Sequence, residues 1–310
     1  MPTRKLGEVA TERLAKLHEM QKDPDRFRPV PTGLIDLDSI VKGGFPRGAF
    51  YISVIGQDKR GKSTLGFQLF TSYCERTGEK GILYDLEENE MEAADRAMTI
   101  RSARVSRTNI YKLELTDEDF EDLHEYAAEV SLYETYVNDQ IYKLADIIAD
   151  AKKQGASIIC IDNFQLLVDG TGRDTREKLE SLSKIIMRAR NNDGMRIFLL
   201  AQGNEKDKSF GSSQVLRDAN LVILIEHMFE ASDKKKKSPL QNLRKLSVTR
   251  SRWSGTGELE VVFQPEFSRV RTVTITLKDP ILEDFASFEQ LELVLPDEEE
   301  PDYVRSKKDG

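Results

Sequence analysis

The sequence predicts an α/β fold with a mostly parallel sheet flanked by helices. Short apolar runs of strand length alternate with longer stretches of helical periodicity, an order typical of parallel strands joined by crossover helices. The apolar runs are Phe50 to Ile55, Gly81 to Leu86, Ser157 to Ile161, Arg196 to Ala201 and Leu221 to Ile225. The helical stretches are Gly61 to Arg76, Glu90 to Ile100, Ile141 to Lys153 and Thr175 to Asn191. A glycine-rich loop between the first run and the first helical stretch supports the same prediction.

The segments after Glu226 alternate like antiparallel strands, and we expect them to extend one edge of the sheet. They are Leu243 to Thr249, Glu260 to Phe263 and Val270 to Thr276. We divide the chain into an N-terminal amphipathic helix with a linker (1–31), a main domain (32–279) and an acidic C-terminal tail (280–310). The N-terminal helix is predicted because Leu6, Ala10, Leu14 and Leu17 share one helical face.

Composition narrows the classes of protein. The 310 residues carry a net charge of −8, which argues against a protein that coats nucleic acid with its whole surface but permits a local basic channel. The sequence has no run of 18 apolar residues and no apolar leader, so neither membrane insertion nor secretion is indicated. Cys74 and Cys160 lie in predicted apolar elements, and reduced core cysteines fit a cytoplasmic setting.

The stretch from Gly56 to Ser63 matches G-x-x-x-x-G-K-[ST] between a strand candidate and a helix candidate. This context predicts a phosphate-binding loop, because glycines let backbone N–H groups surround phosphate oxygens and the helix N-terminus adds partial positive charge. We expect Lys62 to reach the β- and γ-phosphates of ATP and Ser63 to bind Mg²⁺. The predicted nucleotide contacts are Gly56, Asp58, Lys59, Arg60, Gly61, Lys62, Ser63 and Thr64.

Polar side chains end three further strand candidates. Glu87 and Glu88 follow the second one, at the sheet edge where ligands of open α/β folds bind, and a carboxylate there can activate water. Asp162 directly follows the third apolar run, as in a Walker B segment that holds Mg²⁺. Gln202 ends the fourth run and is a candidate sensor of the γ-phosphate.

Two arginines, Arg250 and Arg252, end the first antiparallel segment and are expected on one face of that strand. They are an ordinary solvated edge or an arginine finger. We expect Arg252 to lie far from the phosphate-binding loop of its own chain, so a finger at this position would act on the ATP of a neighbouring subunit.

Taken together, these motifs resemble the ring-forming RecA-like replicative helicases: the DnaB type and the helicase parts of phage primase-helicases and Twinkle. The resemblance runs from about Thr32 to about Arg269 and depends on the order of the whole set. Besides the phosphate-binding loop and the Arg-x-Arg pair, it includes Thr32 to Asp38, Leu86 to Glu88 with Ala94 to Arg96, Ile161 to Leu167, and Gly211 to Ser213 before Asp218.

The resemblance implies a RecA-like P-loop ATPase core, ATP and Mg²⁺ as cofactors, and assembly into a homo-oligomeric, hexameric ring on single-stranded DNA. By position, Glu87 is the catalytic base, Asp162 the Walker B acid, Gln202 the phosphate sensor, and Arg252 the finger with Arg250 as its companion. The alignment selects Glu87, although the neighbouring Glu88 has the same chemistry. The N-terminal helix resembles a linker helix that clasps the neighbouring subunit, and a helix packed on its own chain is the alternative.

Two loops are expected to line the pore of such a ring. Their basic residues, which suit contact with backbone phosphates without base readout, are Arg173, Arg176, Lys206 and Lys208. The acidic tail is interpreted as a docking peptide for a separate primase, polymerase or single-strand-binding protein, or as a solubilising tail. The alternatives to a helicase are a recombinase or recombination mediator that forms filaments on DNA, and a regulatory ATPase of the clock-protein type.

Overall fold

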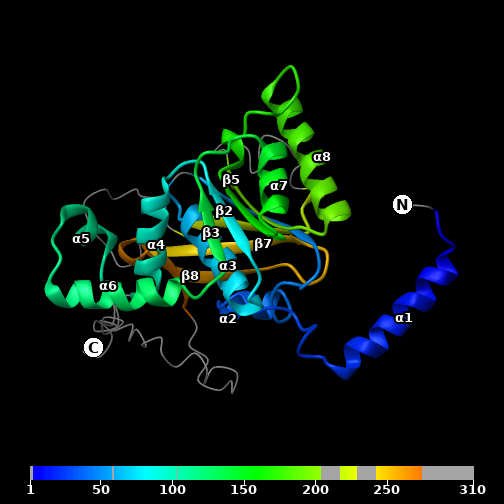
Figure 1. Cartoon of the computed structure of the whole chain (residues 1–310), viewed down its shortest axis with the longest axis horizontal. Helices are drawn as coiled ribbons and strands as arrows, with labels where there is room; N and C mark the ends of the chain where they lie inside the picture. Colours follow the sequence, from blue (N-terminus) through cyan, green and yellow to red (C-terminus); the bar gives the residue numbers. More distant parts are fainter. Residues whose placement is uncertain (1–2, 58, 103, 204–216, 229–241, 274–310) are drawn as a thin grey trace, which may run out of the picture. The chain divides into compact units, whose positions relative to one another are not determined.

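The computed structural model describes residues 3–57, 59–102, 104–203, 217–228 and 242–273. In these residues, nine strands form one sheet in the order β3-β2-β4-β5-β1-β6-β7-β8-β9. Figure 1 shows helices beside this sheet. Neighbours from β3 through β6 pair in parallel, whereas those from β6 through β9 pair antiparallel. The predicted α/β fold with an antiparallel edge is therefore confirmed. The strands are β1 (Phe50–Gly56), β2 (Gly81–Asp85), β3 (Thr135–Asn138), β4 (Ile158–Asp162), β5 (Arg196–Gln202), β6 (Leu221–His227), β7 (Leu243–Ser251), β8 (Gly257–Gln264) and β9 (Arg269–Thr272).

The four predicted crossover helices are present, with ends that move by up to three residues. Two short 3₁₀ helices, η1 (Phe164–Leu166) and η3 (Pro265–Phe267), follow β4 and β8. The α-helices are α1 (Leu6–Lys22), α2 (Ile35–Ile40), α3 (Lys62–Thr77), α4 (Glu90–Ser102), α5 (Arg107–Lys112), α6 (Asp117–Val130), α7 (Leu144–Lys153) and α8 (Thr175–Asp193).

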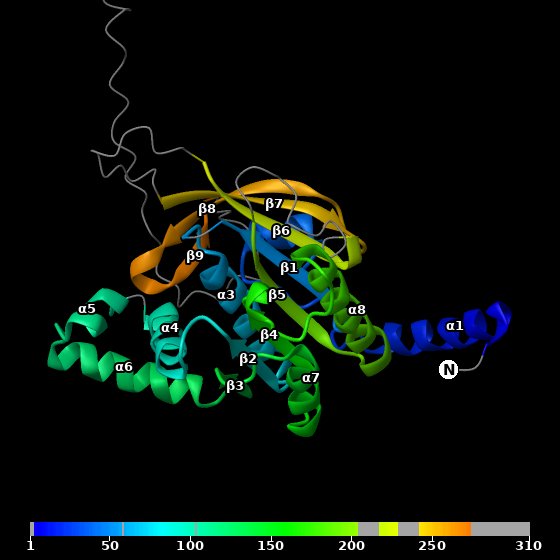
Figure 2. The same ribbon diagram turned by 90° about the horizontal axis from the view of Figure 1, so that it is seen from above.

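Alternation along β1 builds a core on each face of the sheet. Phe50, Ile52 and Val54 pack into one core together with α3, while Tyr51 and Ile55 pack into the other with α7 and α8. Figure 2 shows α7 and α8 on one side of the sheet and α3 on the other. Because both faces are covered, the central strands are continuous apolar runs, which is why the sequence revealed them.

The registers of the parallel strands bring their last residues together at one edge. Gly56 of β1 lies opposite Gln202 of β5, and Asp85 of β2 lies opposite Asp162 of β4. In an open α/β sheet this carboxyl edge is where ligands bind. The polar residues that end these strands therefore lie along one edge of the sheet.

The region from 103 to 140 holds elements that the sequence did not reveal. β3 is four residues long and half-exposed, so its residues lack an apolar run. α6 is strongly polar, and a capping box between Thr116 and Asp119 marks its start. This helix packs against α4. This packing depends on tertiary contacts, which hydrophobic periodicity alone does not predict.

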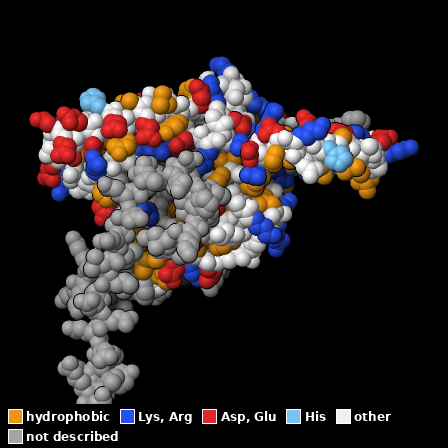
Figure 3. All heavy atoms as spheres, turned by 90° about the horizontal axis from the view of Figure 1, so that it is seen from below, with side chains coloured by type: hydrophobic (Ala, Val, Ile, Leu, Met, Phe, Trp, Pro, Cys, Tyr) orange, Lys and Arg blue, Asp and Glu red, His pale blue; other side chains and the backbone are white. Residues whose placement is uncertain are grey.

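The N-terminal helix α1 contains no buried residue. Leu6, Leu14 and Leu17 are 83%, 55% and 43% exposed, and Figure 3 shows hydrophobic side chains on the surface of this helix. The division at residue 32 stays a prediction, as does the acidic tail, because residues 274–310 lie outside the described ranges. Among the helices that the structure describes, none is long and apolar enough to cross a membrane.

Candidate active site

The loop between β1 and α3 has the backbone that phosphate binding needs. Gly61, the N-cap of α3, has a φ of +95°, a left-handed conformation that glycine adopts at little steric cost. A Cβ at Gly61 would lie 3.0 Å from Cε2 of Phe263, and a Cβ at Gly56 would lie 2.5 Å from Cγ2 of Ile225. Both glycines of the motif are therefore required by their surroundings.

A cavity of about 350 Å³ opens beside this loop. The loop and the first turn of α3 contribute Gln57, Lys59, Gly61, Lys62, Ser63 and Thr64 to its lining. Of the other predicted nucleotide contacts, Gly56 and Arg60 do not line the cavity. Arg60 instead donates to Oε1 of Gln57 at 2.6 Å, and Asp58 lies outside the described residues.

The opposite walls come from α4, α5 and the antiparallel part of the sheet. Glu87, Glu88, Arg96 and Arg107 form one wall, and Phe263 and Pro265 form another. Four lysine or arginine side chains therefore line a cavity that holds two carboxylates. This excess of positive charge suits a polyphosphate, and the Phe263 ring supplies an apolar surface next to it.

Lys62, which lines the cavity, pairs with Asp162 at the end of β4, a buried residue that does not itself line the cavity. The Lys62 ammonium is buried and lies 3.6 Å from Oδ1 of Asp162. That oxygen is buried and makes no hydrogen bond among the described residues. A buried carboxylate oxygen with unused acceptor capacity, near the hydroxyl-bearing Ser63 of the loop, has the chemistry that Mg²⁺ requires. The residues present fit the predicted metal.

Asp85 fixes the turn that carries the two glutamates. Its Oδ1 accepts the N–H groups of Glu87 and Glu88 at 3.2 and 2.9 Å. Burial, with the nearby negative charge of Asp162 as the second cause, raises the pKa of Asp85 to about 7. The turn thus has an internal anchor that the sequence analysis did not identify. The available signal was a second acid at a strand end, in register with the Walker B acid.

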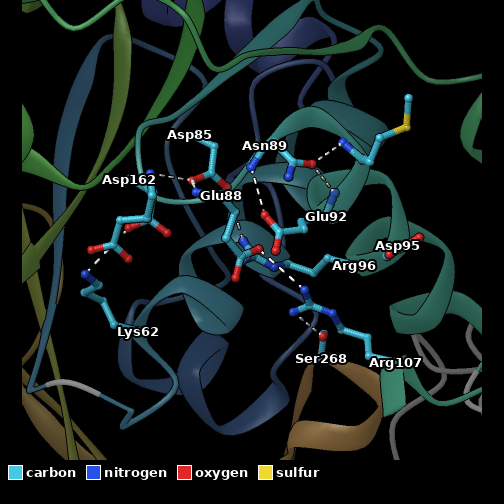
Figure 4. A network of polar contacts seen from close by, with 12 residues as sticks. Lys62, Asp85, Glu88, Asn89, Glu92, Asp95, Arg96, Arg107, Asp162 and Ser268 are labelled. Carbon is cyan, nitrogen blue, oxygen red and sulfur yellow. Dashed lines mark hydrogen bonds and ion pairs between the residues drawn. The ribbon is translucent and has the colours of Figure 1, made fainter. Parts of the chain in front are cut away.

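The two glutamates have different surroundings, and Figure 4 shows Glu88 with Arg96 and Arg107. Glu88 forms ion pairs with two arginines, the buried Arg96 of α4 and Arg107 of α5. Glu87 is exposed and accepts a hydrogen bond from Nδ2 of Asn163. Glu88 is held by two cations, whereas Glu87 faces the cavity without an ion pair among the described residues. The sequence assigned the base to Glu87 by alignment only, and because both glutamates line the cavity this assignment stays a prediction.

Gln202 ends β5 next to the first glycine of the loop. It lies opposite Gly56 in the sheet, but it does not line the cavity. Its backbone C=O accepts from Nε2 of Gln165 at 2.9 Å, and its N–H donates to Oε1 of the same side chain at 3.2 Å. The position is suited to a sensor, while its contact with a γ-phosphate stays a prediction.

Arg250 and Arg252 lie away from the cavity. Arg250 pairs with Val222 near the start of β6, and β7 ends at Ser251, so Arg252 is just past the strand and not on its face as expected. The Arg252 N–H donates to the C=O of Asn220 at 2.9 Å. Gly56, by contrast, is in register with Ile225, five residues after Asn220. At about 3.3 Å a residue, roughly 16 Å of strand separates Arg252 from the loop of its own chain.

Two of the four predicted DNA-binding residues fall outside the described residues. Arg173 is exposed in the loop before α8, where its N–H donates to Oε2 of Glu177 at 2.7 Å. Arg176 belongs to the first turn of α8. Lys206 and Lys208 lie in the undescribed range 204–216, which begins two residues after Gln202. Their predicted role therefore depends on the sequence.

The comparisons with known proteins concern the family and the fold. The family model described as DnaB-like helicase C terminal domain matches residues 29–272. A search of curated proteins found no match. A solved structure described as an ATPase domain has a TM-score of 0.74 at 16% identity, over 88% of this chain and 100% of that one.

Two further solved structures share the fold. A DnaB-like replicative helicase, described with its interactions with primase, has a TM-score of 0.71 at 16% identity, over 88% of this chain and 68% of that one. A KaiC-like protein from Pyrococcus horikoshii has a TM-score of 0.53 at 17% identity, over 80% and 100%. These likenesses establish the RecA-like fold, and the match to the family model establishes the family. The chain belongs to the DnaB-like helicase C-terminal domain family, whose members are ATP-hydrolysing replicative helicases that act on DNA and form oligomers.

Proposed function

We propose that this chain is one subunit of a hexameric ring that uses ATP to move along single-stranded DNA and unwind duplex DNA. The observation that carries this proposal is the separation of the two halves of the catalytic machinery. Lys62 and Glu87 line the cavity and Asp162 lies 3.6 Å from the Lys62 ammonium, whereas roughly 16 Å of strand separates Arg252 from the phosphate-binding loop of the same chain. A complete site then needs the arginine of a neighbouring subunit.

The proposed site residues have different tasks in hydrolysis. Lys62 would neutralise charge on the β- and γ-phosphates, and Ser63 and Asp162 would hold Mg²⁺, which would offset further phosphate charge. Glu87 orients and deprotonates the attacking water, and Arg252 of the neighbour stabilises the charge that develops on the γ-phosphate. The Phe263 ring, which lines the cavity, would supply an apolar contact for the nucleotide. Gln202 reports the state of the γ-phosphate to the segment that follows it.

The hydrolysis test is an ATPase measurement with Mg²⁺, in the presence and absence of single-stranded DNA. A motor that moves on DNA is expected to hydrolyse ATP faster when DNA is bound. If hydrolysis is indifferent to DNA, the chain is a regulatory ATPase. Helical filaments on DNA in electron micrographs, in place of closed rings, would make it a recombinase.

The loop lysines are expected to contact the DNA backbone. Replacing Lys206 and Lys208 together by alanine should weaken single-stranded DNA binding for all sequences, because both side chains bind phosphates and not bases. Since the double variant neutralises two fewer phosphates, the slope of log K against log salt should flatten by about 1.4. Fluorescence anisotropy over a salt series measures both effects.

The matched control removes the same charge from the opposite edge of the sheet. Lys152 and Lys153 are exposed at the end of α7, which leads to the amino end of β4. Their double alanine variant should keep the affinity and the salt slope of the intact protein. Unchanged DNA binding after loss of Lys206 and Lys208 would remove the loop assignment.

The exposed apolar face of α1 is proposed to clasp the neighbouring subunit. Within the described part of its own chain, nothing buries Leu6, Leu14 or Leu17, and burying such side chains is favourable by about 1.5–3 kcal/mol each. Deleting residues 1–22 should therefore shift the assembly to lower mass in mass photometry. Leu14→Glu combined with Leu17→Glu should act like the deletion, whereas Lys16→Glu on the polar face should not. An intact ring after the deletion would contradict the clasp.

The acidic segment near the C-terminus is proposed as a docking peptide for a primase, polymerase or single-strand-binding protein. The run Asp297 to Glu300 and Asp302 supplies its charge. It lies outside the described residues, so only its sequence supports this role.

A further inference from the structure

Asn163 is a buried amide placed between the catalytic base and the end of β4. It is 3% exposed and follows the Walker B residue Asp162 directly. Its Nδ2 donates to Oε1 of Glu87, and its Oδ1 accepts the N–H of Gln165 at 2.8 Å. Both polar atoms of the amide are therefore hydrogen-bonded, the nitrogen to the carboxylate of Glu87 and the oxygen to the main-chain N–H of Gln165.

Gln165 makes a two-point contact with the last residue of β5. Its Oε1 accepts the N–H of Gln202 at 3.2 Å, and its Nε2 donates to the C=O of Gln202 at 2.9 Å. Both bonds go to the main chain, so a displacement of this peptide moves the Gln165 amide with it. The next residue, Gly203, donates its N–H to the C=O of Gly56 in the phosphate-binding loop at 3.1 Å.

These contacts form one continuous series of hydrogen bonds. It begins at the main chain of Gln202, passes through the side chain and N–H of Gln165 and the amide of Asn163, and ends on the carboxylate of Glu87. The series starts just before the segment that contains Lys206 and Lys208. It therefore joins the proposed DNA-binding segment to the proposed base without passing through the nucleotide.

We propose that Asn163 and Gln165 are positioning residues that couple DNA binding to the orientation of Glu87. The inference rests on the proposed function, because it takes Glu87 as the base and the segment after Gly203 as the DNA contact. When DNA fixes the end of β5, Gln165 holds Asn163 in place, and Asn163 aims the carboxylate at the attacking water. A mere packing role for either side chain would not link the two events.

The Asn163→Asp variant tests the contact with the base. Aspartate has the same shape and keeps the acceptor for Gln165, but it loses the donor and places a second carboxylate against Glu87. We expect kcat for ATP hydrolysis to fall roughly 10–100-fold, as for a general base that is displaced but not removed. KM for ATP should stay within about threefold, because phosphate contacts are untouched. A kcat within twofold of that of the intact protein would contradict the proposal that Asn163 orients Glu87.

The Gln165→Met variant tests the coupling. Methionine keeps the length of the side chain but makes neither bond to Gln202. The ratio of kcat with single-stranded DNA to kcat without it should fall by at least about fivefold, with KM and DNA affinity changed far less. Gln165→Glu, which keeps the acceptor and loses the donor, should lower the same ratio. If the methionine variant does not fold, the glutamate variant alone tests the coupling. The matched control is Gln154→Met at the exposed end of α7, which should leave the ratio unchanged.

The outcomes separate this inference from the proposed function. If the intact protein hydrolyses ATP faster with DNA and Glu87→Gln does not hydrolyse ATP, the proposed function stands whatever the variants of Asn163 and Gln165 do. If the ratio of kcat with DNA to kcat without DNA in Gln165→Glu equals that of the intact protein, only the proposed coupling through Gln165 and Asn163 is overturned. If the intact protein ignores DNA, both fail, because there is no stimulation to transmit.

Discussion

Glu87→Gln is expected to lower the rate of ATP hydrolysis by roughly 10²–10⁴-fold, the usual contribution of a general base. Glutamine keeps the size of the side chain and an acceptor for the Asn163 amide, but it cannot take a proton from water. ATP should still bind with an affinity within a few-fold of the intact protein, because Lys62 and the phosphate-binding loop are unchanged. Steady-state kinetics and binding of a fluorescent nucleotide measure the two quantities.

Glu88→Gln is the matched control, since it makes the same change one residue away. Glu88 pairs with Arg96, whose side chain is 2% exposed, so its loss leaves this buried cation with the more distant Asp85 carboxylate, 3.8 Å away, as its remaining ion pair among the described residues. We expect a lower melting temperature and a kcat that stays within about tenfold of the intact protein. Loss of hydrolysis in Glu88→Gln with normal hydrolysis in Glu87→Gln would transfer the role of base to Glu88.

Arg252→Ala is expected to lower ATP hydrolysis by roughly 10³–10⁵-fold, as for an arginine finger, and the deficit should be repaired in a mixed ring. An interface between an Arg252→Ala subunit and a Glu87→Gln subunit can bring an intact Glu87 together with an intact Arg252. In an equal, random mixture about a quarter of the head-to-tail interfaces have this composition. Two inactive proteins should therefore regain activity when their subunits exchange.

The mixture separates action across the interface from action within one chain. If Arg252 served its own site, every site in the mixture would lack one group and no activity would return. Arg188→Ala, at an exposed position on α8, is the control for loss of an arginine charge. Continued inactivity of a mixture with demonstrated subunit exchange would contradict the finger.

The central strands could be predicted because their sequences satisfy a simple physical rule. A strand covered on both faces is apolar throughout, and a polar residue at its end, such as Asp162 or Gln202, lies at the ligand edge. The phosphate-binding loop is equally local, because Gly61 and Lys62 act within one turn. These features depend on neighbours in the sequence, and the fold and family were accessible from them.

The remaining parts of the site depend on contacts between distant residues. Arg96 and Arg107 distinguish Glu88 from Glu87, and both come from helices whose approach to the turn is a tertiary effect. Asp85 looked like an ordinary strand residue until the register placed it opposite Asp162. Phe263 reaches the loop from β8, about 200 residues later in the chain. Local sequence patterns do not predict such contacts between distant residues.

Strand displacement from a forked DNA duplex tests the central claim most directly. The intact protein and Glu87→Gln are compared with ATP and Mg²⁺ at equal concentrations of assembled protein. The account predicts that the intact protein releases the displaced strand and that the variant binds the fork without releasing it. DNA-stimulated ATP hydrolysis by the intact protein with no strand release would contradict a helicase that unwinds by itself.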